Sequence, residues 1–524
     1  MKLAVYALGA GLAVSTALAA TADAKTLRWA SQGDALTMDP HAQNEGPTGT
    51  LNSQVYDSLI HRDAGLVKTP GLAVSWSTVE PTVWRFKLRQ GVSFHGGQPF
   101  TADDVVFSLR RALSETSDFK NYINSIEEVR KVDDLTVDII TKGPNPILPD
   151  QITSIRIMDK EWSEQNKVEK PQNYKEAEET FAVRNANGTG PFIVAQRDPG
   201  IRTVLKRNDA WWGWGVTDPK TNVEEVVYTP IANPATRVAA LLSGEVDFVL
   251  DPPLQDLARI GATSGLKVSQ VNQIRTIFFG MDVGAAELRH SNVKGKNPFQ
   301  DPKVREAMYR AIDVDTIKAK TMRGLSFPAG IITSGGVHGY TPELDQRLSY
   351  DPAKSKALLA EAGYPDGFEV QLDCPNDRYN NDEAICQATV GMLARIGVKA
   401  SLNARSKSVY FKSLQNKESD FYLLGWGVPT HDSHYVFSYL AASKGSWNFV
   451  NFSDKRLDDL TNAMEIETDS AKRDAMIAEA WKILKDSNVY IPLHHQVIAW
   501  GLKAGLELPI IANDSPQFRM AMWK

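Results

Sequence analysis

The side chains best suited to chemistry lie together in residues 425–435, which read GWGVPTHDSHY. This segment follows the apolar run at 421–424, which predicts a buried strand. Loops at the ends of strands are where α/β sheets bind ligands. Trp426 offers an apolar stacking face, whereas Asp432 and His431 offer polar groups for hydrogen bonds. We therefore expect all three residues to contact a small-molecule ligand.

Each of these residues also has a purely structural explanation. Trp426 would pack beside a cleft, Asp432 would cap the loop, and His431 would be exposed to solvent. His431 and His434 have the spacing of two metal ligands on one side of a helix, but a loop does not guarantee that arrangement. Apart from Asp432, no cysteine or acidic cluster lies nearby in the sequence. We therefore expect no metal and no cofactor.

The sequence contains none of the common catalytic motifs that we searched for. It has no G-x-S-x-G elbow, no H-E-x-x-H motif and no G-x-x-x-x-G-K-[ST] phosphate loop. Residues 188–190 begin like a dinucleotide-binding loop, but Phe192 and Ile193 follow where the pattern needs a third glycine. Catalytic triads are also assembled from distant residues, so these absences do not exclude catalysis. They favour a binding protein over an enzyme.

The composition excludes several classes of protein. The chain has 524 residues, a formal net charge of −5 and 42% hydrophobic residues. These values are typical of a globular protein with about three domains or two large ones. No long run of lysine and arginine suggests nucleic-acid binding. After residue 24, no apolar run approaches the roughly 20 residues that span a bilayer.

The beginning of the chain reads as an export signal. Lys2 provides a positive start, and residues 3–20 are almost wholly apolar or small. Residues 22–24 read Ala-Asp-Ala, which fits the small-x-small pattern that a signal peptidase recognises. We expect residues 1–24 to be a signal peptide, cleaved after Ala24, and the mature chain to reach the periplasm of a Gram-negative cell. The alternative is an uncleaved anchor helix.

Cys374 and Cys386 are the only two cysteines, twelve positions apart. In an oxidising compartment two such thiols pair, so export predicts a structural disulfide between them. A metal site or a catalytic thiol are the alternatives. Without a nearby histidine, both have weak support.

Strand and helix patterns alternate along the rest of the chain. Apolar and charged side chains alternate at 84–88, as in a half-buried strand, and Thr101 with Asp104 forms a helix capping box. The Asp-Pro-Gly sequence at 198–200 predicts a hairpin turn. Three further helices are predicted where a capping residue precedes proline, at Asn233, Asp301 and Asp351. The sequence therefore predicts an α/β fold.

Two neighbouring motifs identify a family resemblance. Residues 84–97 read WRFKLRQGVSFHGG and residues 100–108 read FTADDVVFS. They resemble the signature of the family 5 extracellular solute-binding proteins, the oligopeptide, dipeptide and nickel class that supplies ABC importers. Further matching motifs follow in order: GTGPF at 188–192, SGEVD at 243–247, DPKVREA at 301–307, LLAEAGY at 358–364 and RIGV at 395–398. The resemblance therefore covers nearly all of the mature chain.

The resemblance implies a periplasmic binding protein-like fold of type II, with two lobes, a hinge and an extra domain on the first lobe. We expect the first lobe to comprise residues 25–63, 184–285 and 495–524. The extra α/β domain would comprise residues 64–183, and the second lobe residues 286–494. A ligand between the lobes would stabilise their closed arrangement, because it contacts both lobes only there.

The resemblance also implies which residues contact the ligand. The family's peptide binders carry a tryptophan, which Trp426 matches, and three positions later an aspartate that pairs with the α-ammonium of the peptide. Pro429 occupies that position in this sequence, and the lost charge-assisted contact is worth about 1.5–3 kcal/mol. Asp432 is the candidate replacement. Two other segments are expected to reach the ligand through Asn44, Glu45, Arg378 and Tyr379.

We therefore expect a monomeric, non-enzymatic periplasmic protein. It would capture a peptide or peptide-like solute and deliver it to an ABC permease that is driven by separate ATPase subunits. Arg378 would bind a solute carboxylate, unless it is a surface arginine. Within this class, the alternatives are an oligosaccharide, an opine-like conjugate or a metal chelate. Outside it, the alternatives are an exported hydrolase and a sensory receptor.

Overall fold

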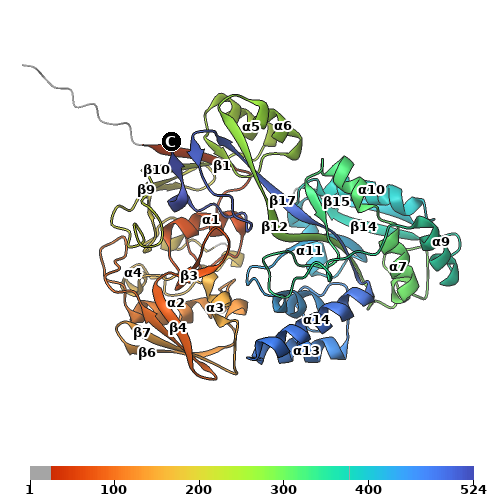
Figure 1. Ribbon diagram of the computed structural model, residues 1–524, viewed down its shortest axis with the longest axis horizontal. Helices are drawn as coiled ribbons and strands as arrows, with labels where there is room; N and C mark the ends of the chain where they lie inside the picture. Colours follow the sequence, from red (N-terminus) through yellow and green to blue (C-terminus); the bar gives the residue numbers. More distant parts are fainter. Residues whose placement is uncertain (1–24, 177, 377) are drawn as a thin grey trace, which may run out of the picture.

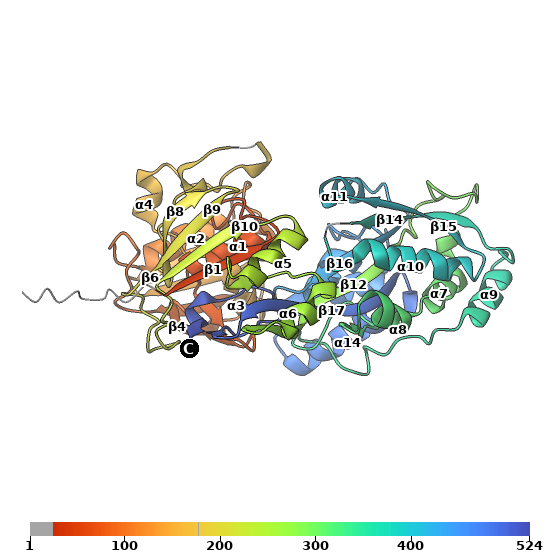
Figure 2. The same ribbon diagram turned by 90° about the horizontal axis from the view of Figure 1, so that it is seen from above.

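The computed structural model describes residues 25–176, 178–376 and 378–524, which form two lobes (Figures 1 and 2). The signal peptide expected at 1–24 lies outside the described residues. The first lobe, on the left in Figure 1, contains the N-terminal strand and the C-terminal end of the chain. Among the described residues, no helix combines the length and the apolar character needed to cross a membrane.

One large mixed sheet runs through both lobes. Its strands are β1 (Thr26–Ser31), β8 (Phe192–Asp198), β9 (Arg202–Arg207), β10 (Glu225–Pro230), β11 (Phe248–Val249), β12 (Leu266–Met281), β13 (Ser326–Pro328), β14 (Glu369–Pro375), β15 (Lys399–Arg405), β16 (Phe421–Gly427) and β17 (Tyr490–Lys503). Their order is β15-β14-β16-β12-β17-β11-β1-β10-β9-β8, and β13 pairs with β17. The antiparallel pairing of β8 with β9 confirms the predicted hairpin.

The long strands β12 and β17 join the lobes (Figure 1). They pair antiparallel, but their register shifts between Asn272 and Thr276, so residues 273–275 leave the ladder. From Arg275 onward β12 pairs with β16 of the second lobe. An interruption of this kind bends a strand and redirects its side chains. The two lobes therefore meet at the point where the pairing of β12 with β17 is broken.

The first lobe carries a second, smaller sheet with its own core. The sheet has the order β4-β5-β7-β6 and consists of β4 (Ala73–Glu80), β5 (Val83–Leu88), β6 (Ile126–Asp133) and β7 (Thr136–Thr141). Phe86 of β5 packs with Val105 and Leu109 of helix α2 (Ala102–Ala112). The predicted capping box at Thr101 and Asp104 is present at the start of this helix. Two further two-stranded sheets pair β2 (Ile60–Arg62) with β3 (Lys68–Pro70) and β18 (Leu506–Glu507) with β19 (Met522–Trp523).

Several helices begin at capping residues that the sequence predicts. The other helices of the first lobe are α1 (Gly46–Val55), α3 (Leu148–Gln151), α4 (Lys160–Gln165), α5 (Pro234–Ser243) and α6 (Leu257–Ala262). Those of the second lobe are α7 (Pro302–Arg310), α8 (Val314–Thr316), α9 (Pro352–Glu361), α10 (Asp382–Ala394), α11 (Lys407–Gln415), α12 (His434–Val436), α13 (Lys455–Ile466) and α14 (Ser470–Ser487). As predicted, Asn233, Asp301 and Asp351 accept backbone N–H hydrogen bonds at the starts of α5, α7 and α9.

Helices cover both faces of the sheet in the second lobe. Phe279 of β12 and Leu423 of β16 belong to a core that includes residues of α7, α9 and α10. Their neighbours Phe278 and Leu424 belong to the opposite core, which includes residues of α13 and α14. Because successive side chains of a strand point to opposite faces, β12 and β16 fill both cores at once. The apolar run at 421–424 therefore positions the end of β16 rigidly.

The residue limits expected for the domains remain a prediction. The four-stranded sheet, at 73–141, falls inside the range expected for the extra domain. The register break at 273–275, which lies between the lobes, falls inside the range expected for the first lobe.

Cys374 and Cys386 form a disulfide between the end of β14 and helix α10. Both cysteines are fully buried. The predicted pairing is therefore present, and it closes the loop that contains Arg378 and Tyr379.

Replacing both cysteines by alanine should destabilise the protein by about 3 kcal/mol, because the short closed loop restricts the unfolded chain. Urea unfolding monitored by circular dichroism measures this loss. A double variant as stable as the wild type would contradict a stabilising role for the disulfide.

Candidate functional site

Strand β16 extends further than the sequence predicts. Gly425, Trp426 and Gly427 continue the pairing with β12, where Trp426 lies opposite Thr276. The expectation that a loop begins at residue 425 is therefore wrong, and Trp426 belongs to the strand. Glycine is unfavourable in strands, so the two flanking glycines suggested a loop. The partner strand β12 holds them in the ladder.

Trp426 forms one side of an aromatic cluster with Tyr435, Tyr439 and Trp447. Its ring centroid lies 5.6 Å from that of Tyr435, 6.0 Å from Tyr439 and 5.4 Å from Trp447. Tyr435 and Tyr439 lie 4.4 Å apart. The indole N–H of Trp426 is buried and has no hydrogen-bond partner among the described residues. The cluster thus combines flat apolar faces with one unused donor.

The aromatic cluster lies at the boundary between the lobes. Tyr122 of the first lobe has its ring centroid 6.1 Å from that of Tyr435 in the second lobe. Burial raises the pKa of both phenols above the usual value. Both phenols are therefore neutral at pH 7, and the two lobes meet here through uncharged aromatic rings.

Of the two predicted residues in the N-terminal loop, one reaches this boundary. The side-chain amide of Asn44 donates a hydrogen bond to the hydroxyl of Tyr122 over 2.9 Å. The carboxylate of Glu45 instead caps helix α1, where it accepts hydrogen bonds from the backbone N–H and the hydroxyl of Thr48. Asn44 is therefore positioned beside the aromatic cluster, whereas Glu45 has a structural role.

The carboxylate oxygens of Asp432 accept four hydrogen bonds from residues of the second lobe. Arg473 donates two hydrogen bonds to its carboxylate, each over 2.7 Å. Nδ1 of His338 lies 2.9 Å from Oδ2, and the backbone N–H of His434 donates to Oδ1 over 2.9 Å. A carboxylate has about four acceptor positions, and these bonds use them. Asp432 therefore has no acceptor position left for a ligand ammonium.

The neighbours of the Asp432 carboxyl favour its charged form. Burial alone would raise the pKa of the Asp432 carboxyl, but hydrogen bonds from His338 and Arg473 hold it well below its usual range. The hydrogen bond to Asp432 raises the pKa of His338, whose Nε2 also lies 2.6 Å from Asp474. The network thus fixes the loop after β16 to helix α14.

His431 lies close enough to the first lobe to feel the charges of Arg62 and Lys68. Its backbone adopts a left-handed conformation, with φ at 55°. Its Nδ1 lies 3.3 Å from the carbonyl oxygen of Gly336. Burial lowers the pKa of His431 to about 4, and the charges of Arg62 and Lys68 in the first lobe lower it too. The imidazole is therefore neutral at pH 7 and available for hydrogen bonding.

Arg378 and Tyr379 lie against the other face of the end of β16. The Tyr379 hydroxyl donates to the carbonyl oxygen of Gly425 over 3.3 Å. The guanidinium carbon of Arg378, which is exposed, lies 5.0 Å from the centroid of the Tyr379 ring. Asp382 accepts the backbone N–H of both residues, each over 2.9 Å. The structure thus brings both predicted residues to the strand that carries Trp426.

Several residues of this region have no counterpart in the sequence prediction. Tyr435 is the last residue of the candidate segment, and Tyr439 follows it with a spacing of four, which places the two side chains on one helical face and was a usable signal. Trp447 and Tyr122 are separated from it in sequence. Only the packing of the lobes brings Tyr122 to Tyr435, so no local pattern predicts it.

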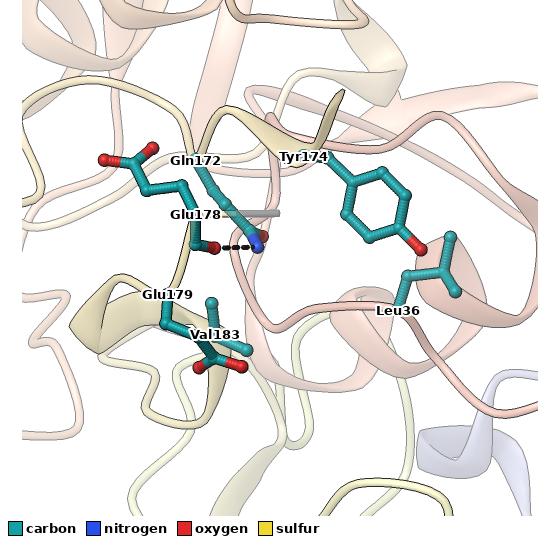
Figure 3. A pocket seen from close by; sticks show the side chains of 6 residues that line it. All are labelled: Leu36, Gln172, Tyr174, Glu178, Glu179 and Val183. Atoms are coloured by element: carbon teal, nitrogen blue, oxygen red, sulfur yellow. Dashed lines mark hydrogen bonds between the residues drawn. The ribbon is translucent and has the colours of Figure 1, made fainter. Parts of the chain in front are cut away.

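Two hollows in the surface lie away from this boundary. One, of about 270 Å³, is lined by residues of the first lobe (Figure 3): Leu36, Gln172, Tyr174, Glu178, Glu179 and Val183. In it, the side chain of Gln172 donates to the backbone carbonyl of Glu178. A second, of about 400 Å³, is lined by residues between Ile312 and Tyr350 of the second lobe. Neither hollow is lined by both lobes.

Within the described ranges, one group of acidic side chains has the spacing of a metal site: Asp104, Asp159 and Glu161. Asp104 belongs to the capping box of α2, and Asp159 caps α4. Capping explains why these two carboxylates are held close together. His431 and His434 do not belong to a group of this kind in the described part of the chain.

Comparison with known proteins gives a consistent result. The family model described as bacterial extracellular solute-binding proteins, family 5 Middle, matches residues 68–448. The dipeptide-binding protein of Escherichia coli K12 is 28% identical to this chain, with 95% of this chain and 94% of the relative covered.

Two solved structures share the fold of the chain. The PBP AgaA of A. tumefacien R10, in complex with agropinic acid, is 25% identical with a TM-score of 0.75, and 94% of this chain and 96% of that one are covered. The dipeptide binding protein of a Pseudoalteromonas species, in complex with Met-Leu, is 21% identical with a TM-score of 0.80, with coverage of 95% and 100%. The fold is therefore the type II two-lobe fold that the resemblance implies.

Replacing Arg473 by methionine should destabilise the protein by about 3–5 kcal/mol, because Asp432 would remain buried without its main partner. Urea unfolding measures the loss. The matched control is Arg456→Met, which removes an exposed arginine paired with Glu479 and should change stability by less than about 1 kcal/mol. Equal stability of the two variants would contradict the role given to Arg473.

His338 should stabilise the fold more in acid than in base. Because its pKa is raised in the folded protein, its contribution is complete below the unfolded value of about 6.5 and is lost as the pH rises through the folded value. The difference in Tm between wild type and His338→Gln should therefore be larger at about pH 5.5 than at about pH 8.5. A difference that grows with pH would contradict this assignment.

Proposed function

Because the chain belongs to the bacterial extracellular solute-binding proteins of family 5, we propose that it captures a peptide or peptide-like solute between its two lobes. The family consists of substrate-binding proteins, and we assign no catalytic activity to this chain. The captured solute is delivered to an ABC permease in the inner membrane, and separate ATPase subunits supply the energy. Export through the N-terminal signal would place the mature chain, as a monomer, in the periplasm.

The contact between Tyr122 and Tyr435 carries this proposal. It joins the first lobe to the aromatic cluster of the second lobe, beside the tryptophan that matches the family pattern. A solute that separates these rings gains apolar contacts with both lobes only when the lobes are close together. Its affinity for the closed arrangement then shifts the equilibrium toward closure.

The proposed site combines stacking surfaces with a few polar groups. Trp426 would provide the flat face. The side chains of Asn44, His431 and Tyr379 would form hydrogen bonds with the solute, and those of Asn44 and Tyr379 would exchange their present bonds to Tyr122 and Gly425. Arg378 is placed to bind a carboxylate, since its guanidinium is exposed beside Tyr379. Glu45 and Asp432 are left out of the site as direct contacts, because both carboxylates are already bonded.

A non-peptide acid is the second candidate solute. The family's peptide binders hold the α-ammonium with an aspartate, but this chain has Pro429 at that position and Asp432 is occupied by Arg473. The relative AgaA, which is 25% identical, was solved in complex with agropinic acid. Both observations support an opine-like acid as an alternative to a peptide.

Replacing Trp426 by alanine should weaken solute binding by about 1 kcal/mol or more, the scale of one aromatic contact. Calorimetry with the solute released from the purified wild-type protein measures this change. Trp426→Phe keeps an aromatic face and should bind more tightly than the alanine variant.

Trp76→Ala is the control, since Trp76 belongs to the small sheet of the first lobe. Unchanged affinity in a folded Trp426→Ala protein would remove Trp426 from the site. A wild-type protein that carries no solute from the periplasm would contradict the proposed function itself.

A further inference from the structure

One residue at the tip of the hairpin between β2 and β3 is buried, although the rest of the tip is exposed. The tip comprises residues 63–67 of the first lobe. Leu66 has only 8% of its surface accessible, whereas its neighbour Val67 has 62%. Hairpin tips normally lie in solvent. Another part of the molecule must therefore cover Leu66.

The second lobe provides this cover. Leu66 belongs to the hydrophobic core that contains Leu424 and Trp426 of β16, and the other buried members of this core lie between residues 274 and 511. The base of the hairpin belongs to the first lobe, since Ile60 of β2 is part of the core of the small sheet. The hairpin thus has its base in one lobe and one apolar side chain of its tip in the other.

The backbone of the tip holds Leu66 in this orientation. Leu66 has a φ of 65°, a left-handed conformation that leucine rarely adopts. The carboxylate of Asp63 accepts the backbone N–H groups of Gly65 and Val67, each over 2.9 Å. Nη1 of Arg62 donates to the carbonyl oxygen of Leu66 over 2.8 Å. An unfavourable conformation that its neighbours hold in place points to a function.

The tip is also fixed to the body of the first lobe. Nη2 of Arg62 donates to Oδ1 of Asp150 over 2.8 Å, and Lys68 forms an ion pair with the other carboxylate oxygen. Asp150 belongs to helix α3. Because both strands of the hairpin are tied to this helix, the tip moves together with the first lobe.

Two further observations place the lobes in contact around the hairpin. Burial lowers the pKa of His431 in the second lobe, and the charges of Arg62 and Lys68 at the base of the hairpin lower it further. A Cβ atom placed on Gly143, which follows β7 of the first lobe, would lie 3.6 Å from Cγ2 of Ile466 at the end of α13. The docking of Leu66 is therefore part of a wider contact between the lobes.

The burial of Leu66 depends on how close the lobes are. When the lobes separate, the side chain becomes exposed to water, because the rest of the tip is exposed and does not cover it. When the lobes close, the apolar side chain leaves water, which stabilises the closed arrangement. Both surfaces belong to the same chain, so this stabilisation does not require a solute and adds to the one that a solute provides.

We infer that Leu66 is a clasp, which docks into the core of the second lobe and stabilises the closed arrangement with or without a solute. The inference rests on the proposed function, in which closure captures the solute, and adds a residue that sets the affinity. Apparent affinity rises with the fraction of molecules that already have the binding-competent arrangement. Removing the clasp should therefore weaken solute binding by opening the solute-free protein.

The first test measures the docking of Leu66 directly. The chain has only two cysteines, and both are in the disulfide, so Leu66→Cys introduces one free thiol. Val67→Cys is the control at the exposed neighbour. The rate of reaction with a maleimide is measured on the full mature chain, freed of solute by unfolding and refolding, with and without the probes Met-Leu and agropinic acid. Each rate is divided by that of the unfolded variant.

Without a probe, the thiol of Leu66→Cys should react at least about threefold more slowly than that of Val67→Cys, and a bound probe should increase the difference to about tenfold or more. Equal rates in the solute-free proteins would overturn the inference, since Leu66 would then be protected only as a solute contact or not at all. Complete protection that a bound probe does not increase would also overturn it, because the lobes would then never separate.

The second test measures affinity by calorimetry with the same two probes. Leu66→Ser should bind about tenfold more weakly than the wild type, the factor that corresponds to the burial of one leucine. Leu66→Met keeps an apolar side chain of similar size and should bind within about threefold of the wild type. The matched control Val67→Ser should bind like the wild type.

The melting temperature separates a clasp from an ordinary core residue. Tm of solute-free Leu66→Ser should stay within about 2 °C of the wild type, whereas the loss of a permanently buried leucine lowers Tm by several degrees. A clearly lower Tm, or a probe that Leu66→Ser binds as tightly as the wild type, would overturn the inference and leave the proposed function standing.

Mass spectrometry of the solute that co-purifies with the wild type completes the design. If the wild type carries a solute but binds neither probe, that solute, once identified, replaces the probes in both tests. A wild type that binds neither probe and carries no solute would overturn the proposed function and, with it, the role of Leu66 in affinity.

Discussion

The pairing of β12 with β17 is the interaction on which the rest of the molecule depends. These two strands belong to a single sheet that continues into both lobes, so the lobes share a backbone ladder. The ladder is interrupted at residues 273–275, which do not pair with β17. The strands can bend there without breaking hydrogen bonds between them. The same interruption places Arg275 next to Gly427. The break in the pairing of β12 with β17 therefore lies next to the end of β16 that carries Trp426.

The charged groups near the boundary divide into two sets with different roles. Asp432, Arg473 and His338 satisfy one another and fix the loop that follows β16. Arg378, on the other side of β16, has its exposed guanidinium against the ring of Tyr379. The completed network holds the aromatic cluster in place, because Tyr435 follows it directly in the chain. The network of Asp432, Arg473 and His338 thus fixes the segment beside the aromatic cluster.

Local patterns predicted what depends on local physics. The capping residues at Thr101, Asn233, Asp301 and Asp351 begin helices as expected, because each satisfies backbone N–H groups of its own first turn. Trp426 is predicted as a ligand contact because its segment follows an apolar strand, and that role stays a prediction. The hydrogen bonds that occupy the Asp432 carboxylate could not be predicted, because Arg473, which donates two of them, lies 41 residues away in the sequence. The same holds for the contact of Tyr122 with Tyr435, which only the packing of the two lobes produces.

The central claim is that a solute holds the two lobes together. Small-angle X-ray scattering of the solute-free protein, before and after reloading with the solute released from it, tests this directly. The account predicts a smaller radius of gyration in the reloaded protein, because the bound molecule selects the arrangement in which both lobes touch it. Superimposable scattering curves at saturating solute, with binding verified in the same sample, would contradict it.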